Sequence, residues 1–334
     1  MVITRTPFRI SFFGGGTDYP GWYKEHGGAV LSTSINKYCY IICRELPPFF
    51  DCKYRIRYSQ HEEVLTVAEI KHPSVRACLT HVSVPYGIEM QHNADVPGMS
   101  GLGSSSAFTV GLLRALHALM DRDITKYQLA RDAIHVEQHI IQENVGSQDQ
   151  TAAAFGGFNK IEFGGPEEIR VTPLPIDGDR LRELQQHLVL VFTRFGRNAS
   201  EIAGEQIRTL DKKYAELNHM RQLVNEAYAV FTTPTRSLDE IGILLHETWL
   251  LKRSLTSKIT TPFIDDAYEA ARQGGALGGK LLGAGGGGFM LFYVRPEARP
   301  RVLEKLKGLL HVPFAFESFG SHVIYNMNSD IHLT

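Results

Sequence analysis

Glycine is the residue that most constrains this chain, because it is concentrated in three short runs. Fourteen of the 31 glycines among the 334 residues lie at Gly14–Gly16, at Gly101 and Gly103, and between Gly274 and Gly288. A low-complexity chain would scatter its glycines along the sequence. Runs of this kind indicate places where the backbone closely approaches a ligand or another segment, because glycine has no Cβ in the way.

The composition predicts a folded protein with a packed core. Hydrophobic residues make up 43% of the chain and charged residues 21%, which disfavours disorder. The formal net charge is −1, so no strong basic balance points to a nucleic-acid partner. No apolar run approaches the ~20 residues that a bilayer span requires, and Met1 to Arg9 lack the apolar segment of a signal peptide. We therefore expect no membrane partner and a cytoplasmic location.

The cysteines do not indicate a metal site. Cys39, Cys43, Cys52 and Cys78 form no CxxC pair, and no matching histidine cluster follows them. Reduced thiols, as in a cytoplasmic protein, are the better interpretation.

Strand patterns dominate the first third of the chain, and helical patterns dominate most of the rest. Extended patterns predict strands over 1–13 with an interruption at Pro7, over 29–44, within 53–67, and over 158–163, 188–193 and 289–294. Helical spacing predicts helices over 104–120, 125–142, 200–230, 237–254, 262–273 and 299–310. Prolines crowd the segment after residue 165, which suggests one domain over 1–170 and a second over 171–334. This order predicts an α+β fold.

The central glycine run lies in a loop that leads directly into a predicted helix. The loop reads Pro97-Gly98-Met99-Ser100-Gly101-Leu102-Gly103-Ser104-Ser105-Ser106-Ala107. Its glycines let backbone N–H groups reach a ligand, and the helix N-terminus adds unpaired N–H groups and a partial positive charge. Together these features favour a phosphate site, with serine hydroxyls as further donors. The alternative is an ordinary Gly/Ser loop with serine caps, and the Gly-Lys-Ser/Thr of a Walker A loop is absent.

The C-terminal glycine run, Gly283–Gly288, matches the pattern GxGxxG literally. A dinucleotide-binding motif requires a strand before these glycines and a helix after them. Here a helix-like segment precedes the run, and the strand-like Phe289–Val294 follows it. We therefore expect tight backbone packing against another segment or a ligand.

Two carboxylates, Glu137 and Asp149, lie twelve residues apart after the phosphate loop. Taken singly, Glu137 is typical of a solvated helix charge, and Asp149 of a turn or helix cap. Phosphoryl transfer, however, needs oxygen ligands for Mg²⁺ and a residue that positions the acceptor hydroxyl. A phosphate loop nearby makes the pair a candidate for these two tasks.

Three segments, in order, resemble the GHMP small-molecule kinases, which include galactokinase, homoserine kinase, mevalonate kinase and phosphomevalonate kinase. They are Thr6–Tyr19, Pro97–Ala107 and Lys280–Phe289, and the spacing of Glu137 and Asp149 also matches the family. The resemblance spans nearly the whole chain. It implies an ATP-dependent, Mg²⁺-requiring phosphotransferase with an alcohol group as acceptor. It also implies a two-domain α+β fold with the active site in the cleft between the domains.

Within that superfamily the chain is most similar to the D-glycero-D-manno-heptose 7-phosphate kinases. The likeness lies in Arg9–Asp18, His246–Leu255 with Lys258, and Gly275–Leu282. It implies phosphorylation of the anomeric 1-hydroxyl to a 1,7-bisphosphate, for nucleotide-activated heptose. The alternatives are a kinase for another sugar, such as fucose or galactose, and a non-catalytic sugar or nucleotide sensor. Gly-Gly-Gly-Thr-Asp stands here where galactokinases have Gly-Glu-His-Thr-Asp, which weakens the galactose alternative.

The resemblance also implies roles for particular residues. Asp149 orients or deprotonates the sugar hydroxyl, and Arg9 supplies a cation beside it that offsets transition-state charge. The residues implied for the ATP phosphates are Pro97, Gly101, Leu102, Gly103, Ser104, Ser105 and Ser106, and those for Mg²⁺ are Ser105, Ser106 and Glu137. The residues implied for the substrate are Gly15, Gly16, Thr17, Asp18, Gly285 and Gly286. A phosphorylated sugar needs a second cationic pocket, for which the candidates are Arg197, Lys252 and Lys258. The expected partner is this small molecule, with the chain a monomer or a homodimer.

Overall fold

The computed structural model describes residues 1–165, 168–193 and 199–327, and it has the α+β architecture that the sequence predicts. The strands are β1 (Val2–Phe13), β2 (Gly28–Glu45), β3 (Tyr54–Arg57), β4 (His61–Val64), β5 (Ile88–Ala94), β6 (Phe158–Phe163), β7 (Ile169–Pro173), β8 (Leu188–Phe192), β9 (Ala276–Leu281), β10 (Phe289–Val294), β11 (Leu310–His311), β12 (Phe316–Glu317) and β13 (His322–Asn326). The α-helices are α1 (Pro20–His26), α2 (Pro73–Val82), α3 (Ser104–Leu119), α4 (Lys126–His135), α5 (Gln148–Phe155), α6 (Gly178–His187), α7 (Ala199–Arg208), α8 (Tyr214–Thr232), α9 (Asp239–Leu255), α10 (Pro262–Gly274) and α11 (Arg299–Lys305).

The first sheet is large and mostly antiparallel. Its strand order is β13-β1-β2-β5-β3-β4; β6 and β12 also pair with β2, and β7 pairs with β6. The strand predicted over 1–13 is present, but the predicted interruption at Pro7 is wrong. Pro7 stays within β1, at a register shift between Pro7 and Phe8 in the pairing with β2. A strand tolerates proline at such an irregularity because the ladder lacks a regular hydrogen bond there.

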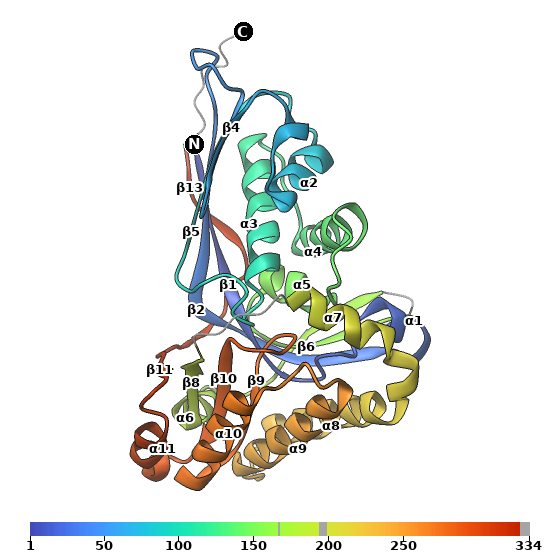
Figure 1. Cartoon of the computed structure of the whole chain (residues 1–334), viewed down its shortest axis with the longest axis vertical. Coiled ribbons are helices and arrows are strands. Elements are labelled where there is room, and N and C mark those ends of the chain that lie inside the picture. Colours follow the sequence, from blue (N-terminus) through green and yellow to red (C-terminus); the bar gives the residue numbers. More distant parts are fainter. Residues whose placement is uncertain (166–167, 194–198, 328–334) are drawn as a thin grey trace.

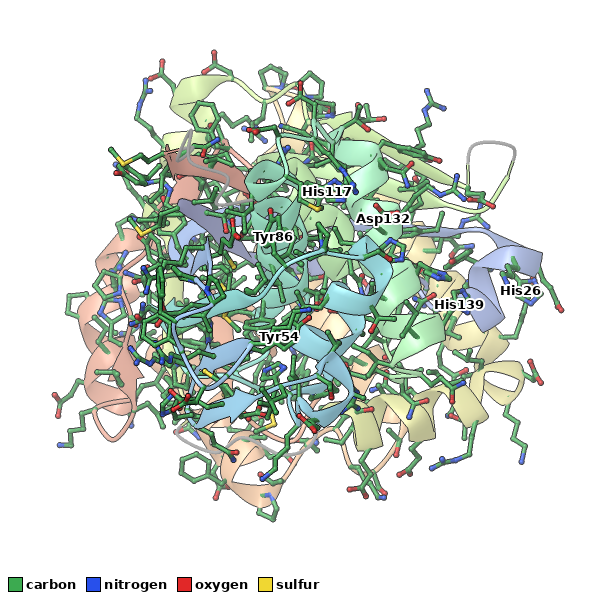
Figure 2. All side chains as sticks on the ribbon, turned by 90° about the horizontal axis from the view of Figure 1, so that it is seen from above. His26, Tyr54, Tyr86, His117, Asp132 and His139 are labelled. Carbon is green, nitrogen blue, oxygen red and sulfur yellow. The ribbon has the colours of Figure 1, made fainter. Side chains whose placement is uncertain are left out.

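Helices α2, α3, α4 and α5 cover one face of this sheet (Figure 1). Helix α3 buries Phe108, Leu112 and Leu116 at helical spacing, as the sequence predicts, and it packs on β1 and β2. Figure 2 shows the same layer from above, with His117 on α3 and Asp132 on α4. The layer therefore fixes the N-terminus of α3 against the first strand.

The second sheet has four strands in the order β11-β8-β10-β9. It lies at the other end of the molecule from β4, beside α9 and α10 (Figure 1). Its core contains Trp249, Tyr268 and Phe292, which are almost fully buried. The last two strands, β12 and β13, return to pair with β2 and β1 of the first sheet. The predicted division at residue 170 falls within β7, and it stays a prediction.

Several element boundaries differ from the sequence prediction. The helix predicted over 125–142 begins at the Thr125 cap, whose hydroxyl accepts from the Gln128 backbone, but α4 passes into a π-helix over Val136–Ile140. The helix predicted over 200–230 is two helices, α7 and α8, joined by a short 3₁₀ turn over Leu210–Lys213. The helix predicted over 299–310 ends at Lys305. Within the described ranges, no helix is long and apolar enough to cross a membrane.

Candidate active site

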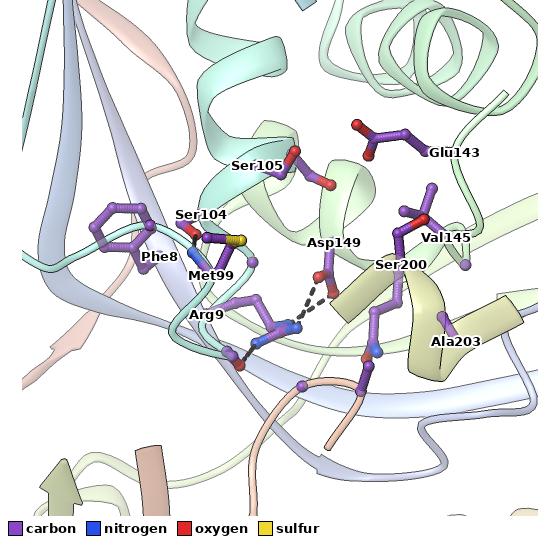
Figure 3. Close-up of a pocket in the computed structure, with 18 of the residues that line it drawn as sticks. Phe8, Arg9, Met99, Ser104, Ser105, Glu143, Val145, Asp149, Ser200 and Ala203 are labelled. Carbon is purple, nitrogen blue, oxygen red and sulfur yellow. Dashed lines mark hydrogen bonds and ion pairs between the residues drawn. The ribbon is translucent and has the colours of Figure 1, made fainter. Parts of the chain in front are cut away.

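A cavity of about 490 Å³ lies where the N-terminus of α3 meets the glycine run before β10. The parts of the chain that line it are β1 with the loop after it, the segments of Tyr58, His72 and His92, the loop before α3, the segment that leads into α5, helix α7, and the regions around Lys252 and Lys280. Figure 3 shows Ser104 and Ser105 at the start of α3, with Ser200 and Ala203 of α7 across from them. The cavity thus joins segments that are far apart in the sequence.

The predicted phosphate loop ends at Gly103, which caps α3 and has a φ of +75°. The Ser104 hydroxyl accepts a hydrogen bond from the Met99 backbone at 3.2 Å, which holds the loop closed on itself. Residues Gly101, Gly103, Ser104, Ser105 and Ser106 line the cavity. The first backbone N–H groups of α3 therefore face a space in which an anion is favoured.

Two residues predicted for this loop lie outside the cavity lining. Leu102 is fully buried in the core, and its carbonyl accepts from the Arg9 backbone at 3.0 Å. Pro97 is exposed, while its neighbours Gly98 and Met99 line the cavity. Leu102 and Pro97 therefore belong to the loop without lining the cavity.

Arg9 and Asp149 form a bidentate pair beside the loop (Figure 3). Arg9 Nε donates to Asp149 Oδ1 at 2.8 Å and Nη2 donates to Oδ2 at 2.7 Å. Arg9 Nη1 also donates to the Gly101 carbonyl at 2.7 Å, so the guanidinium ties the aspartate to the phosphate loop. The Asp149 side chain remains 27% exposed, whereas that of Arg9 is 4% exposed. The predicted contact is confirmed, and the carboxylate faces the cavity.

Glu137 lies behind the loop and is fully buried. The Ser106 hydroxyl donates to its Oε2 at 2.8 Å, and the Gln150 amide donates to the same oxygen. Oε1 has no hydrogen-bond partner among the described residues. Burial raises the pKa of Glu137 to about 7, against hydrogen bonds that lower it.

The surroundings of Glu137 fit a divalent cation. An unpaired buried carboxylate oxygen is costly unless it is protonated or meets a cation. Carboxylate and hydroxyl oxygens are the hard ligands that Mg²⁺ takes from proteins. The π-helix over Val136–Ile140 carries this glutamate, and such helices often occur at functional sites.

Asp18 lies in the cavity wall on the side of β1, and its side chain is nearly buried. Its Oδ1 accepts from the Gly16 backbone at 2.9 Å, and Oδ2 accepts from the Gln148 backbone at 3.4 Å. Burial raises the pKa of Asp18, and the nearby Asp149 raises it further. A Cβ at Gly146 would lie 1.9 Å from Asp18 Oδ2, so this segment requires glycine. Gly15, Gly16 and Asp18 are therefore brought together as predicted.

Three of the residues predicted for the substrate do not line the cavity. The Thr17 hydroxyl is buried and donates to the Gly14 carbonyl at 2.8 Å, so it closes the turn after β1. Gly285 and Gly286 pack on Ile259, and the Gly286 backbone donates to the Ile259 carbonyl at 2.9 Å. Gly283 and Ala284, just before them, line the cavity instead.

The C-terminal glycine run packs against the phosphate loop, which confirms the predicted close approach. A Cβ at Gly283 would lie 2.5 Å from Gly101 Cα, and one at Gly101 would lie 2.6 Å from the Leu282 carbonyl oxygen. The helix predicted over 262–273 is present as α10, but it does not directly precede this run. Strand β9 precedes the run and β10 follows it, because α10 already ends at Gly274. A strand on both sides still excludes the dinucleotide motif.

Replacing Gly288 by alanine is expected to lower the free energy of unfolding by about 3 kcal/mol. Gly288 has a φ of +109°, and a Cβ there would lie 2.2 Å from the Ser100 carbonyl oxygen. Urea unfolding followed by circular dichroism measures the change. Gly308→Ala is the matched control, because a Cβ at Gly308 meets nothing within 4 Å. Equal stability of the two variants would contradict this packing.

The three cations predicted for a second phosphate lie in different environments. The Lys252 side chain is nearly buried and lines the cavity. Lys258 is outside the lining and pairs with Glu201 at 3.1 Å and Glu205 at 3.0 Å. Arg197 lies outside the described residues.

Sequence reasoning missed one aromatic wall of the cavity and a second lysine. His72 stacks on Phe108 with ring centroids 4.7 Å apart, and His92 meets Phe108 edge-on at 5.0 Å. Tyr58 completes this group, which we call the aromatic wall. No sequence spacing connects these residues, since they come from four separate segments. Lys280 also lines the cavity, and its place at the start of the third resembling segment was the available signal.

Comparisons with known proteins agree with this geometry. Residues 69–157 match the model of the GHMP kinases N terminal domain, and residues 222–311 match that of the GHMP kinases C terminal domain. The D-glycero-alpha-D-manno-heptose 7-phosphate kinase of Campylobacter jejuni is 30% identical over 318 residues, covering 92% of this chain and 93% of that protein. A mevalonate kinase of Thermococcus sibiricus is 26% identical over 261 residues, covering 75% of this chain and 72% of that protein.

A solved structure shares the fold over the whole chain. The crystal structure of a D-glycero-D-manno-heptose 1-phosphate kinase from Bacteroides thetaiotaomicron has a TM-score of 0.79 at 24% identity. The match covers 98% of this chain and 100% of that chain. The predicted two-domain arrangement is therefore that of a known fold.

Proposed function

This chain is a GHMP kinase, a phosphotransferase with an alcohol group as acceptor, and we propose that its acceptor is the anomeric 1-hydroxyl of D-glycero-D-manno-heptose 7-phosphate. ATP is the phosphoryl donor, and the product is the 1,7-bisphosphate, a precursor of nucleotide-activated heptose. The observation that carries this proposal is the Arg9–Asp149 pair, which faces one cavity together with Asp18 and the N-terminus of α3. We further propose a cytoplasmic location for the reaction.

Different residues of the cavity have different roles in phosphoryl transfer. Backbone N–H groups at the start of α3, with the hydroxyl of Ser105, bind the phosphates of ATP. Asp149 accepts a hydrogen bond from the sugar 1-hydroxyl and takes its proton as the bond to phosphorus forms. Arg9 holds both carboxylate oxygens and stabilises the negative charge that develops on the phosphoryl group.

Asp18 and Glu137 complete the site in separate positions. Asp18 accepts hydrogen bonds from sugar hydroxyls, since its carboxylate is held by two backbone N–H groups on the cavity wall. Ser105, Ser106 and Glu137 would hold Mg²⁺. A bound Mg²⁺ would neutralise charge on the phosphate oxygens of ATP.

The heptose assignment rests on the C. jejuni relative and on Lys252, a cation in the cavity wall. The alignment covers 93% of that protein, which supports a shared acceptor. A phosphorylated acceptor requires a cation apart from Arg9, which Asp149 already engages. Lys252 lies in the cavity wall, and Arg197 remains a candidate from the sequence.

We propose that the aromatic wall receives the purine base of ATP. Stacking on aromatic rings stabilises a base by about 1–3 kcal/mol. His92→Ala is therefore expected to raise the KM for ATP about tenfold and to leave the KM for the sugar within about twofold. Steady-state kinetics with each substrate varied in turn measures both values. His61→Ala, an exposed histidine on β4, is the control. An unchanged KM for ATP in His92→Ala would mean that the base does not bind at the aromatic wall.

The acceptor is tested directly by a panel of sugars, with mevalonate as a non-sugar alcohol. The protein is incubated with Mg-ATP and each of heptose 7-phosphate, unphosphorylated heptose, fucose, galactose and mevalonate, and ADP release is followed. Heptose 7-phosphate is expected to give the highest kcat/KM. Faster turnover of fucose or galactose would replace the proposed acceptor, and ADP release with none of a broad set of sugars would favour the sensor alternative.

A further inference from the structure

We propose that Lys252 and Lys280 together form a binding site for a phosphate dianion on the cavity wall made by α9 and β9. The two lysines come from different elements, and both line the cavity that holds the Arg9–Asp149 pair. This inference rests on the proposed function. It assigns to the two lysines the binding of a phosphate, either that of the acceptor or the phosphoryl group in transfer.

Both lysines are almost completely buried, which is rare for this residue type. The exposed fraction is 6% for Lys252 and 2% for Lys280. Neither forms an ion pair with a described carboxylate, whereas the more exposed Lys258 pairs with Glu201 and Glu205. Buried charges are normally paired, because an unpaired charge loses its hydration without compensation. Two such lysines beside one cavity indicate an anion that the protein itself does not supply.

Hydrogen bonds fix both ammonium groups and leave part of each available. Lys280 Nζ donates to the Phe12 carbonyl at 3.0 Å. Lys252 Nζ donates to the Leu281 carbonyl at 3.0 Å and also to the Gly283 carbonyl. An ammonium has three hydrogens, so two on Lys280 and one on Lys252 have no acceptor among the described residues. These backbone contacts orient the nitrogens without neutralising them.

The charges around the lysines favour an added anion. Burial and, to a lesser extent, the positive charge of Arg9 lower the pKa of Lys252 to about 7. Burial also lowers the pKa of Lys280, with Lys252 and Arg9 acting in the same direction. Asp18 and Asp149 act in the opposite direction on Lys252, but they do not cancel the effect. A dianion would favour the charged form of both lysines, as a phosphate group does at other cationic sites.

The test compares two acceptors that differ only in a phosphate. Initial rates are measured with heptose 7-phosphate and with unphosphorylated heptose, for the wild type, Lys252→Met, Lys280→Met and the control Lys307→Met. Lys307 is a surface lysine whose side chain is 76% exposed. The Kd of the non-hydrolysable analogue AMP-PNP, measured by calorimetry, shows whether each variant keeps its fold and nucleotide site.

The two sources of phosphate give different results. If the acceptor's own phosphate binds here, Lys280→Met lowers kcat/KM about 30-fold or more for heptose 7-phosphate and leaves that of unphosphorylated heptose within about threefold. If the phosphoryl group in transfer binds here, kcat falls by the same factor for both acceptors. Unchanged kinetics, or an equal rise in KM for both acceptors at constant kcat, would overturn the site.

A second measurement keeps the inference separate from the proposed function. If the wild type uses neither heptose, the acceptor proposal fails, but inorganic phosphate can still be titrated into the protein saturated with AMP-PNP and Mg²⁺. Binding is expected in the wild type and in Lys307→Met, and at least tenfold weaker binding is expected in Lys252→Met and Lys280→Met. No phosphate binding to the wild type would overturn the two-lysine site.

Discussion

Replacing Asp149 by asparagine is expected to lower kcat by a factor of about 10²–10⁴, while the Kd for ATP stays within a few-fold. Asparagine keeps the size of the side chain but cannot take a proton from the acceptor hydroxyl. It also leaves Arg9 without the carboxylate that accepts at 2.8 Å and 2.7 Å. ATP binding is expected to persist because the N-terminus of α3 and the aromatic wall do not depend on this carboxylate.

The measurement for Asp149→Asn combines single-turnover kinetics with calorimetric titration of AMP-PNP. Asp179→Asn is a suitable control, because Asp179 lies in α6 and its side chain is 86% exposed. A kcat within tenfold of the wild type would remove Asp149 from the chemical step. A loss of AMP-PNP binding equal to the loss of kcat would show that the substitution damages the nucleotide site instead.

Glu137→Gln is expected to lower kcat/KM for Mg-ATP by about 100-fold or more, the second largest effect of a single substitution here. Glutamine has nearly the same shape, but its neutral oxygen is a poor ligand for a hard cation. Its amide would also face the donors Ser106 and Gln150, which now donate to Glu137 Oε2. The loss should therefore come from the metal site rather than from an empty space in the core.

Mn²⁺ binding in the presence of AMP-PNP, followed by electron paramagnetic resonance, tests the role of Glu137 without turnover. The apparent Kd for Mn²⁺ is expected to rise in Glu137→Gln and to stay unchanged in Glu162→Gln, a partly exposed glutamate on β6. Equal Mn²⁺ affinity in Glu137→Gln and the wild type would mean that Glu137 is not a ligand.

Local patterns predicted much of the fold. Helix α3 and strand β2 carry long, regular patterns, so tertiary contacts and local preference agree there. Strand β9 was not predicted, because Gly278 and Gly279 hide its pattern, and the structure needs these glycines where a Cβ would clash with α9 or β10. The return of β12 and β13 to the first sheet depends on pairing across some 300 residues, which no local pattern records.

Some residues of the candidate site could be predicted from the sequence, and others could not. Arg9, Asp149 and the loop before α3 belong to segments that resemble those of the GHMP kinases, so they could be predicted. The aromatic wall could not, since His72, His92 and Phe108 meet only through the packing of α2, β5 and α3. Lys252 and Lys258 looked alike in the sequence, and only burial separates the cavity lysine from the surface one.

The position of the new phosphate tests the central proposal most directly. The protein is incubated with Mg-ATP and D-glycero-D-manno-heptose 7-phosphate, and the product is examined by ³¹P and ¹H NMR, with Asp149→Asn as the blank. The account predicts a second phosphate signal coupled to the anomeric proton, in step with ADP formation. A phosphate on any other carbon, or no phosphorylated heptose from the active wild type, would contradict it.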